Sequence, residues 1–323
     1  MKKLLLLALL FLVACTGTSE PPLNLLLAVG DGDRVVFYPA GPDEAVAVGS
    51  WNLGEPVVDL LRLEGESRLW VLGPGALRAY PLSGGALDQA PAQPAASVTL
   101  DLEPGVDCSQ GSLQPGNDEL LLDCGDGKVW TVPLANPALA PVDTSADGPN
   151  TLYLLGPEDL LTKLTPTAGG FELRYPGPGE GYHYSVATTE PSGLSAAWSP
   201  AGVLAIAVDD GQNTTLYTWT AASGDPPKPS GDPLALSGVR FVLPLTEGWL
   251  LGGGQGYALR RPDKADVVRQ KPASYGLVDP NLYAYLGAPG RLVVLDLLDP
   301  ALGEHEHAFA AAPRGLVYLP VGQ

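Results

Sequence analysis

The most constraining feature of this chain is a repeated pattern of two apolar strands joined by a short turn. In each copy an apolar run leads into a turn rich in Gly, Asp or Pro, and a second apolar run follows. Apolar strands that flank such turns are typical of β-hairpins. The seven copies are Asn24–Ala40, Arg68–Leu82, Glu119–Leu134, Thr151–Pro166, Val203–Ala221, Trp249–Pro262 and Asn281–Leu298.

The spacing of these hairpins predicts the architecture. Their turn residues are Gly32, Gly75, Gly127, Pro157, Gly211, Gly254 and Gly290. Six steps lead from Gly32 to Gly290, so one step averages about 43 residues, which is the length of a four-stranded propeller blade. The step from Gly127 to Pro157 is short and the next is long, which indicates an irregular fourth blade with residues 171–189 as its candidate outer hairpin. We therefore predict an all-β chain that forms a single β-propeller, with seven four-stranded blades.

Each blade needs one more strand before its hairpin, on the side of the central channel. Candidates for this inner strand are Pro56–Leu63, Gly105–Ser109, Gly193–Ser199, Gly238–Pro244 and Ala273–Val278. The first hairpin begins at Asn24 and leaves no room for such a strand, whereas the segment Pro313–Pro320 has no hairpin after it. We expect Gly315–Leu319 to supply the inner strand of the first blade. This pairing of the C-terminal strand with the N-terminal hairpin would close the ring and remove exposed strand edges.

One stretch also carries a family resemblance. The segment Ala196-Ala197-Trp198-Ser199-Pro200-Ala201-Gly202 is similar to the start of an inner strand in WD-repeat-like propellers. The other copies lack this pattern, and none ends in the Trp-Asp pair of that family. The resemblance covers roughly residues 23–323 and implies the propeller architecture only.

The N-terminus has the organisation of an export signal. Lys2 and Lys3 form a basic start, and residues 4–14 are an apolar run without charge that is too short to span a bilayer as a helix. The tetrad that ends at Cys15, Leu-Val-Ala-Cys, resembles the lipobox of bacterial lipoproteins. The resemblance implies cleavage before Cys15 and acyl chains on that residue, and two or more chains anchor a protein stably to a membrane.

These features divide the chain into three parts. We expect residues 1–14 to be a signal peptide, residues 15–22 to be the lipidated cysteine with a polar tether, and residues 23–323 to be the propeller. The expected location is the cell envelope, either the outer membrane or the outer face of the inner membrane, with the body outside the cytoplasm. The formal net charge of -18 disfavours binding to nucleic acid, because the protein would repel phosphates.

Two further cysteines are candidates for a disulfide. Cys108 and Cys124 lie on either side of the turn signal Gln114–Asp118. Cysteine pairs of exported proteins favour disulfides because the compartment is oxidising. We expect the two residues to face each other across two antiparallel strands; the alternative is a pair of buried thiols.

Catalytic residue patterns are sparse. Nucleophilic catalysis needs a base beside the nucleophile, and His183, His305 and His307 are the three histidines of the chain. No G-x-S-x-G motif is present. His305 and His307 would point to one face of a strand and are candidates for a metal pair, but we expect them in a polar surface loop. We therefore expect no enzyme, no cofactor and no metal site.

Aspartates recur in the hairpin turns, at Asp31, Asp33, Asp126, Asp209 and Asp210. Aspartate favours turns because it tolerates left-handed backbone angles and bonds its own main chain, whereas Ca²⁺ needs six or more oxygens in one place. We therefore interpret these aspartates as turn residues.

The sequence as a whole leaves two functional hypotheses. The first is a lipid-anchored envelope protein whose propeller binds a protein or an envelope component. The second is a propeller enzyme, or a sensor of an ion or small ligand, with a site at the central channel.

Overall fold

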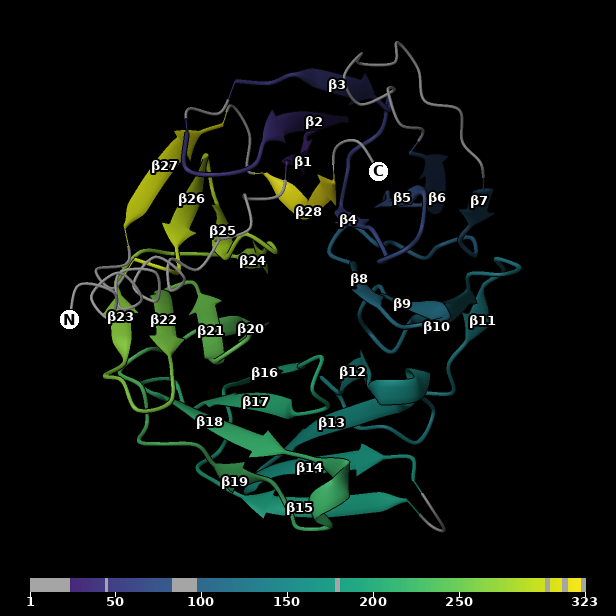
Figure 1. Ribbon diagram of the computed structural model, residues 1–323. Helices are drawn as coiled ribbons and strands as arrows, with labels where there is room; N and C mark the ends of the chain where they lie inside the picture. Colours follow the sequence, from purple (N-terminus) through teal and green to yellow (C-terminus); the bar gives the residue numbers. More distant parts are fainter. Residues whose placement is uncertain are drawn as a thin grey trace, which may run out of the picture.

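The computed structural model describes residues 24–43, 46–82, 98–177, 181–299, 303–309 and 313–320. In this part of the chain, 28 strands form seven four-stranded antiparallel sheets. Two short 3-10 turns, η1 (Pro157–Asp159) and η2 (Ala221–Ser223), are the only helical segments there. The sheets stand around a central axis as the blades of a propeller (Figure 1). The predicted seven-bladed, all-β fold is confirmed.

In the first four blades, the strands follow one another from the channel outward. Blade 1 contains β28 (Arg314–Pro320), β1 (Leu25–Asp31), β2 (Arg34–Pro39) and β3 (Gly49–Asn52). Blade 2 contains β4 (Asp59–Leu61), β5 (Arg68–Leu72), β6 (Ala76–Pro81) and β7 (Val98–Asp101). Blade 3 contains β8 (Ser112–Pro115), β9 (Glu119–Asp123), β10 (Val129–Pro133) and β11 (Ala140–Pro141). Blade 4 contains β12 (Leu152–Leu155), β13 (Leu161–Thr167), β14 (Gly170–Tyr175) and β15 (Tyr182–Ala187).

The remaining three blades have the same order. Blade 5 contains β16 (Gly193–Trp198), β17 (Leu204–Asp209), β18 (Thr214–Trp219) and β19 (Lys228–Pro229). Blade 6 contains β20 (Val239–Leu245), β21 (Gly248–Gly253), β22 (Gly256–Arg260) and β23 (Val267–Arg269). Blade 7 contains β24 (Tyr275–Val278), β25 (Tyr283–Ala288), β26 (Arg291–Asp296) and β27 (Glu304–Ala308).

The two ends of the chain share blade 1, as predicted. β28 pairs with β1 in antiparallel register, with Leu26 opposite Leu319 and Ala28 opposite Val317. The register shifts between Val29 and Gly30. A Cβ atom on Gly30 would lie 2.1 Å from the carbonyl oxygen of Arg314, the first residue of β28. Glycine therefore permits the close approach of the two strands at this bulge.

The fourth blade is where the predicted hairpin was wrong. The segment Thr151–Pro166 contains β12 and nearly all of β13, which are the inner and second strands. The hairpin equivalent to the others joins β13 to β14. Its turn contains Gly169, which lies 42 residues after Gly127 and 42 before Gly211. The blade therefore has normal spacing, and β14 with β15 forms the outer hairpin predicted over residues 171–189.

The inner strand of blade 3 is a second correction. It is β8, which begins at Ser112, and not the predicted segment Gly105–Ser109. Residues 102–111 instead form the connection from blade 2, and Cys108 in this connection donates its amide to the carbonyl of Pro74 at 3.0 Å. The other predicted inner strands, in blades 2, 5, 6 and 7, overlap β4, β16, β20 and β24.

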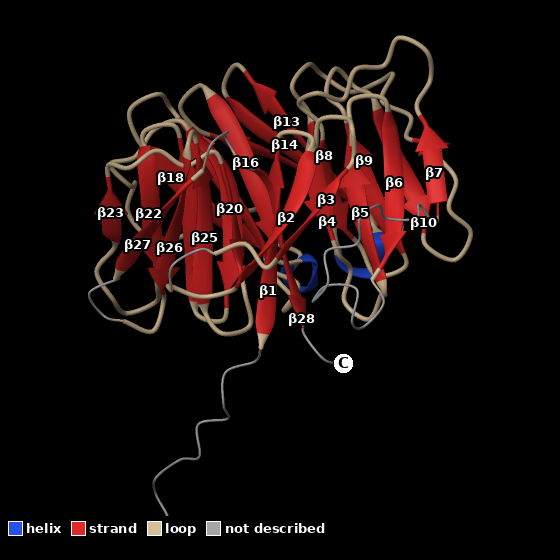
Figure 2. Ribbon diagram, turned by 90° about the horizontal axis from the view of Figure 1, so that it is seen from above, coloured by secondary structure: helices blue, strands red, loops and turns tan. Residues whose placement is uncertain are grey.

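The two faces of the disc carry different parts of each blade. The inner strands begin at one face, which also carries the turns between second and third strands; we call it the mouth face. β1 begins and β28 ends at the opposite face, because Leu25 pairs with Pro320. Figure 2 shows both ends at the lower side of the disc, together with η1 and η2. We call this side the terminal face.

The core lies between neighbouring blades rather than inside one of them. Between blades 1 and 2, for example, Phe37, Trp51, Leu60, Tyr80 and Leu319 belong to one buried cluster. Both faces of each sheet are therefore apolar, which accounts for strands that read as continuous hydrophobic runs. Within the described residues, no helix is long and apolar enough to cross a membrane.

Candidate functional site at the channel mouth

Polar side chains gather where the inner strands of blades 1, 2 and 7 begin. The first residues of these strands are Arg314, Asp59 and Tyr275. A Cβ atom on Gly315 would lie 3.0 Å from the carbonyl carbon of Asp59, which shows how closely β28 and β4 approach at this level. Charged and aromatic groups from three blades are thus brought together at the mouth face.

Asp59 joins blade 2 to blade 3. One carboxylate oxygen accepts the amide of Leu60 at 2.8 Å, and the other accepts the amide of Leu113 on β8, also at 2.8 Å. Burial raises the pKa of Asp59 to about 6, although both backbone donors favour the charged form. The site therefore contains a carboxyl group that changes its charge close to neutral pH.

Tyr275 and Arg314 extend this cluster across the closed ring. The Tyr275 hydroxyl donates to the carbonyl of Pro313, and Arg314 Nη1 donates to the carbonyl of Ser109 at 2.8 Å. Burial raises the pKa of Tyr275 far above its usual range, and the negative charge of Asp59 adds to this effect. The tyrosine therefore stays neutral and acts as a hydrogen-bond donor at the mouth.

A disulfide fixes the connection that presents the Ser109 carbonyl. Cys108 and Cys124 are joined, with their Cα atoms 4.6 Å apart. The turn between β8 and β9 lies where the sequence predicted it, but the ladder ends at the pair Ser112–Asp123, and the two cysteines meet beyond that end. The expectation that they face each other within the strands was therefore wrong in detail.

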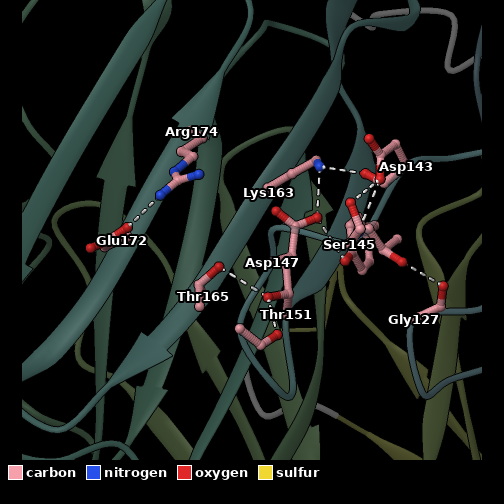
Figure 3. Close-up of polar contacts among 12 residues, drawn as sticks. Gly127, Asp143, Ser145, Asp147, Thr151, Lys163, Thr165, Glu172 and Arg174 are labelled. Atoms are coloured by element: carbon pink, nitrogen blue, oxygen red, sulfur yellow. Dashed lines mark hydrogen bonds and ion pairs between the residues drawn. The ribbon is translucent and has the colours of Figure 1, made fainter.

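A second polar cluster joins blade 3 to blade 4 (Figure 3). Lys163 Nζ donates to the carboxylate of Asp147 at 2.6 Å and to the carbonyl of Asp143 at 3.1 Å. The Tyr153 hydroxyl donates to the same Asp147 oxygen at 3.0 Å. These bonds hold the connection formed by residues 142–151 against β12 and β13, so the cluster is explained by its role in packing two blades together.

Two aspartates of the hairpin turns, Asp209 and Asp210, bond the main chain of their own turn, as the turn interpretation predicts. Asp209 accepts the amide of Gly211 at 2.8 Å, and its other oxygen accepts the amide of Gly238 at 2.5 Å. Asp210 accepts the amides of Gln212 and Asn213. Across the described part of the chain, His, Cys, Asp and Glu side chains form no group of three or more that could hold a metal ion.

The histidines lie away from the channel. His183 is on β15, and His305 and His307 are on β27, which are the outermost strands of blades 4 and 7. The expectation of a surface loop at His305 and His307 was wrong, because both belong to a regular strand and occupy alternate positions on one of its faces. Cys15, with the signal peptide and tether around it, lies outside the described residues.

Sequence reasoning did not single out Asp59, Tyr275 or Arg314. Each stands at the first position of an inner strand, and the strands themselves were predicted correctly. A search for charged or aromatic residues at these equivalent positions would have found the three together. What the sequence could not supply is how closely β28 approaches β4 at the level of their first residues.

Comparisons with known proteins show the fold alone. No protein-family model and no curated protein sequence matches the chain. A functionally unknown protein from Desulfotomaculum acetoxidans has a TM-score of 0.63 at 10% identity, covering 93% of this chain and 100% of its own. A "putative 6-phosphogluconolactonase" from Bacteroides uniformis has a TM-score of 0.66 at 13% identity over 92% and 100%. Apo AztD from Citrobacter koseri has a TM-score of 0.52 at 12% identity over 94% and 100%.

Proposed function

We propose that this chain is a binding module of the cell envelope, anchored to a membrane by lipid on Cys15. The observation that carries the proposal is the position of β1, which begins at the terminal face, opposite the polar mouth. Cys15 lies ten positions before the first residue of β1. An extended chain of that length spans at most about 35 Å. The terminal face would then point to the membrane and the mouth face away from it.

The mouth is suited to binding rather than to nucleophilic catalysis. The three histidines stand on outer strands, remote from Asp59 and Tyr275, whereas an activated nucleophile needs its base within hydrogen-bond reach. Blades that are rigidly packed hold the connecting loops in place, so that a partner is bound without the cost of ordering them. With a net charge of -18, the partner is expected to be neutral or cationic.

The alternative function is an enzyme or a small-ligand sensor at the channel. It is favoured by the raised pKa of the Asp59 carboxyl, since perturbed titratable groups often mark functional sites. One structural neighbour is also named as a putative lactonase. Asp59→Ala separates the two functions. Loss of a small-molecule or lactone-hydrolysing activity in the variant supports the alternative, whereas weaker capture of a protein partner by the variant than by the wild type supports binding at the mouth.

The anchor is tested by labelling cells with radioactive palmitate. We expect label on the wild-type chain and none on Cys15→Ser, with processing of the wild type blocked by globomycin. The double variant Cys108→Ser/Cys124→Ser is the matched control, because it removes the other two cysteines and should keep the label. An unlabelled wild-type chain would refute the anchor.

The orientation is tested with single surface cysteines on the two faces, in a chain that lacks the disulfide cysteines. We choose Asp126→Cys in a turn of the mouth face and Asp225→Cys beside η2 on the terminal face. A bulky maleimide that cannot cross membranes should label the first faster than the second in intact envelopes and at equal rates after solubilisation. Equal rates before solubilisation would contradict the orientation.

A further inference from the structure

Exposed apolar side chains gather in one sector of the disc. Among the described residues, the large apolar side chains that stand exposed are Val46 at 63%, Val48 at 44% and Leu298 at 68%. The first two belong to the connection between β2 and β3 of blade 1, and the third follows β26 of blade 7. These blades are neighbours, because Leu27 and Leu292 pack in one apolar cluster. We call Val46, Val48 and Leu298 the corner residues.

Strand directions place all three corner residues on the terminal face. β1 runs from the terminal face to the mouth face, so β2 runs back and ends where Pro39 pairs with Leu26. In blade 7, β24 begins at the mouth face, and the antiparallel order brings the end of β26 to the terminal face. Within the described chain, the mouth face therefore carries none of the large apolar side chains that stand exposed.

The ring begins at this same corner. Leu25, the first residue of β1, lies on the terminal face of blade 1 (Figure 2). Its carbonyl accepts the amide of Ala40, at the start of the connection that carries two corner residues, at 3.0 Å. Single exposed apolar residues are common on protein surfaces, but these three surround the strand to which the tether would lead. A lipid on Cys15 would therefore hold this corner close to the membrane.

The composition of the two connections indicates the kind of membrane surface that fits. Neither residues 40–48 nor residues 297–303 include a Lys or Arg, and each stretch includes an aspartate, Asp43 or Asp299. Anionic lipid attracts basic segments, so these connections offer it no cation. The net charge of -18 adds a general repulsion from such lipid. A bilayer of zwitterionic lipid therefore suits the corner better than an anionic one.

We propose that the three corner residues insert into the interface of a zwitterionic membrane and give the tethered disc a second point of attachment. The inference deepens the proposed function and rests on its lipid anchor. Lipid on Cys15 alone leaves the disc free to turn about its tether, whereas apolar contact at the corner keeps the mouth face directed away from the bilayer. A second copy of this chain fits less well, because specific protein interfaces bury about 1,200–2,000 Å², far more than three side chains offer.

The test places a fluorophore at the corner of a chain tethered to phosphatidylcholine vesicles. The chain starts at residue 15, before every described strand, and so keeps all seven blades. Its three cysteines are changed to Ser, and a hexahistidine segment before residue 15 binds nickel-chelating lipid. Val46→Cys or Leu298→Cys then carries nitrobenzoxadiazole, whose emission shifts to the blue on entering a bilayer. We expect this shift, and quenching by nitroxide-labelled lipid, at both positions.

Further variants locate the contact. Asp126→Cys carries the fluorophore on the mouth face and should show neither shift nor quenching. In the Val46→Cys chain, Val48→Asp with Leu298→Asp should lower the ratio of inserted to free fluorophore by about tenfold or more, because apolar contact is lost and charge is added. Ala135→Asp with Ala138→Asp is the matched control. It adds the same charge to the terminal face in the connection between β10 and β11 of blade 3 and should leave the ratio unchanged. Circular dichroism will show that the variants remain folded.

Several results would overturn the proposal. These are a fluorophore that stays in water at both corner positions, equal quenching in Asp126→Cys, or a ratio that does not respond to Val48→Asp with Leu298→Asp. Stronger insertion after phosphatidylglycerol replaces part of the phosphatidylcholine would contradict the choice of a zwitterionic surface. Sedimentation that reveals a dimer lost in Val48→Asp with Leu298→Asp would assign the corner to a second copy. The hexahistidine tether acts whether or not cells acylate Cys15, so failure of insertion and failure of palmitate labelling are distinguishable.

Discussion

A chain that stops after Pro313 should lose its whole fold, and not only one strand. The truncation removes β28, in which Leu316, Val317 and Leu319 are exposed by only 8%, 6% and 1%. Burying such a side chain contributes about 1.5–3 kcal/mol, so the three together contribute about 5–9 kcal/mol. This is comparable with the total stability of a typical domain, about 5–15 kcal/mol.

The effect should reach the whole ring because β28 contacts three blades. Leu319 and Val317 pack in the cluster between blades 1 and 2, and Leu316 packs in the cluster between blades 7 and 1. Loss of β28 therefore opens both neighbouring interfaces and leaves the backbone of β1 unpaired on its channel side. We expect Leu319→Ala alone, a milder change, to cost about 2–5 kcal/mol.

Urea unfolding, followed by both circular dichroism and tryptophan fluorescence, measures these changes in the Cys15→Ser background. A chain that stops after Pro320 retains all of β28 and is the matched control, which should keep the midpoint of the full chain. The reasoning would be refuted by a chain ending at Pro313 that unfolds at the unchanged midpoint. It would also be refuted by a first transition that removes blade 1 while the other blades stay folded.

Three further predictions concern local features. Cys108→Ser/Cys124→Ser should lower the free energy of unfolding in urea by about 3 kcal/mol, the chain-entropy value for a loop of this length, and reductant should have the same effect on the parent chain. The pKa of Asp59 is raised to about 6 from 3.8, so its contribution to stability is full below pH 3.8 and is lost as the pH rises through 6. The change in the free energy of unfolding amounts to about 3 kcal/mol. Thermal unfolding at a series of pH values should show that Asp59→Asn removes this part of the pH dependence. Gly30→Ala should cost about 1–3 kcal/mol in urea by overpacking against β28, whereas Gly75→Ala, where a Cβ meets nothing within 4 Å, should not reduce stability.

The fold was largely predictable because each blade repeats the same local pattern. Apolar strands and Gly-containing turns are local signals, and the closing strand was found by asking which segment lacked a partner. Blade 4 was misread because Pro157 lies between two apolar runs and looks like the turn of a hairpin, whereas β14 contains the polar residues Glu172 and Arg174. Periodicity alone cannot distinguish the first strand pair of a blade from the second.

The candidate sites were less predictable, because they depend on neighbours that are distant in sequence. Arg314 and Ser109 are 205 residues apart and meet only when the ring is closed. The inner strand of blade 3 was displaced in the prediction because β8 is short and contains Gln114 and Pro115, which read as part of a turn.

The closure of blade 1 also has a consequence for biogenesis. A ribosome, or a translocation channel that releases the chain from its N-terminus, delivers β1, β2 and β3 first and β28 last. The first-made sheet therefore stays three-stranded, with the backbone of β1 unpaired on its channel side, until β28 has emerged. Closure of the ring is thus a late event in folding, timed by the arrival of β28.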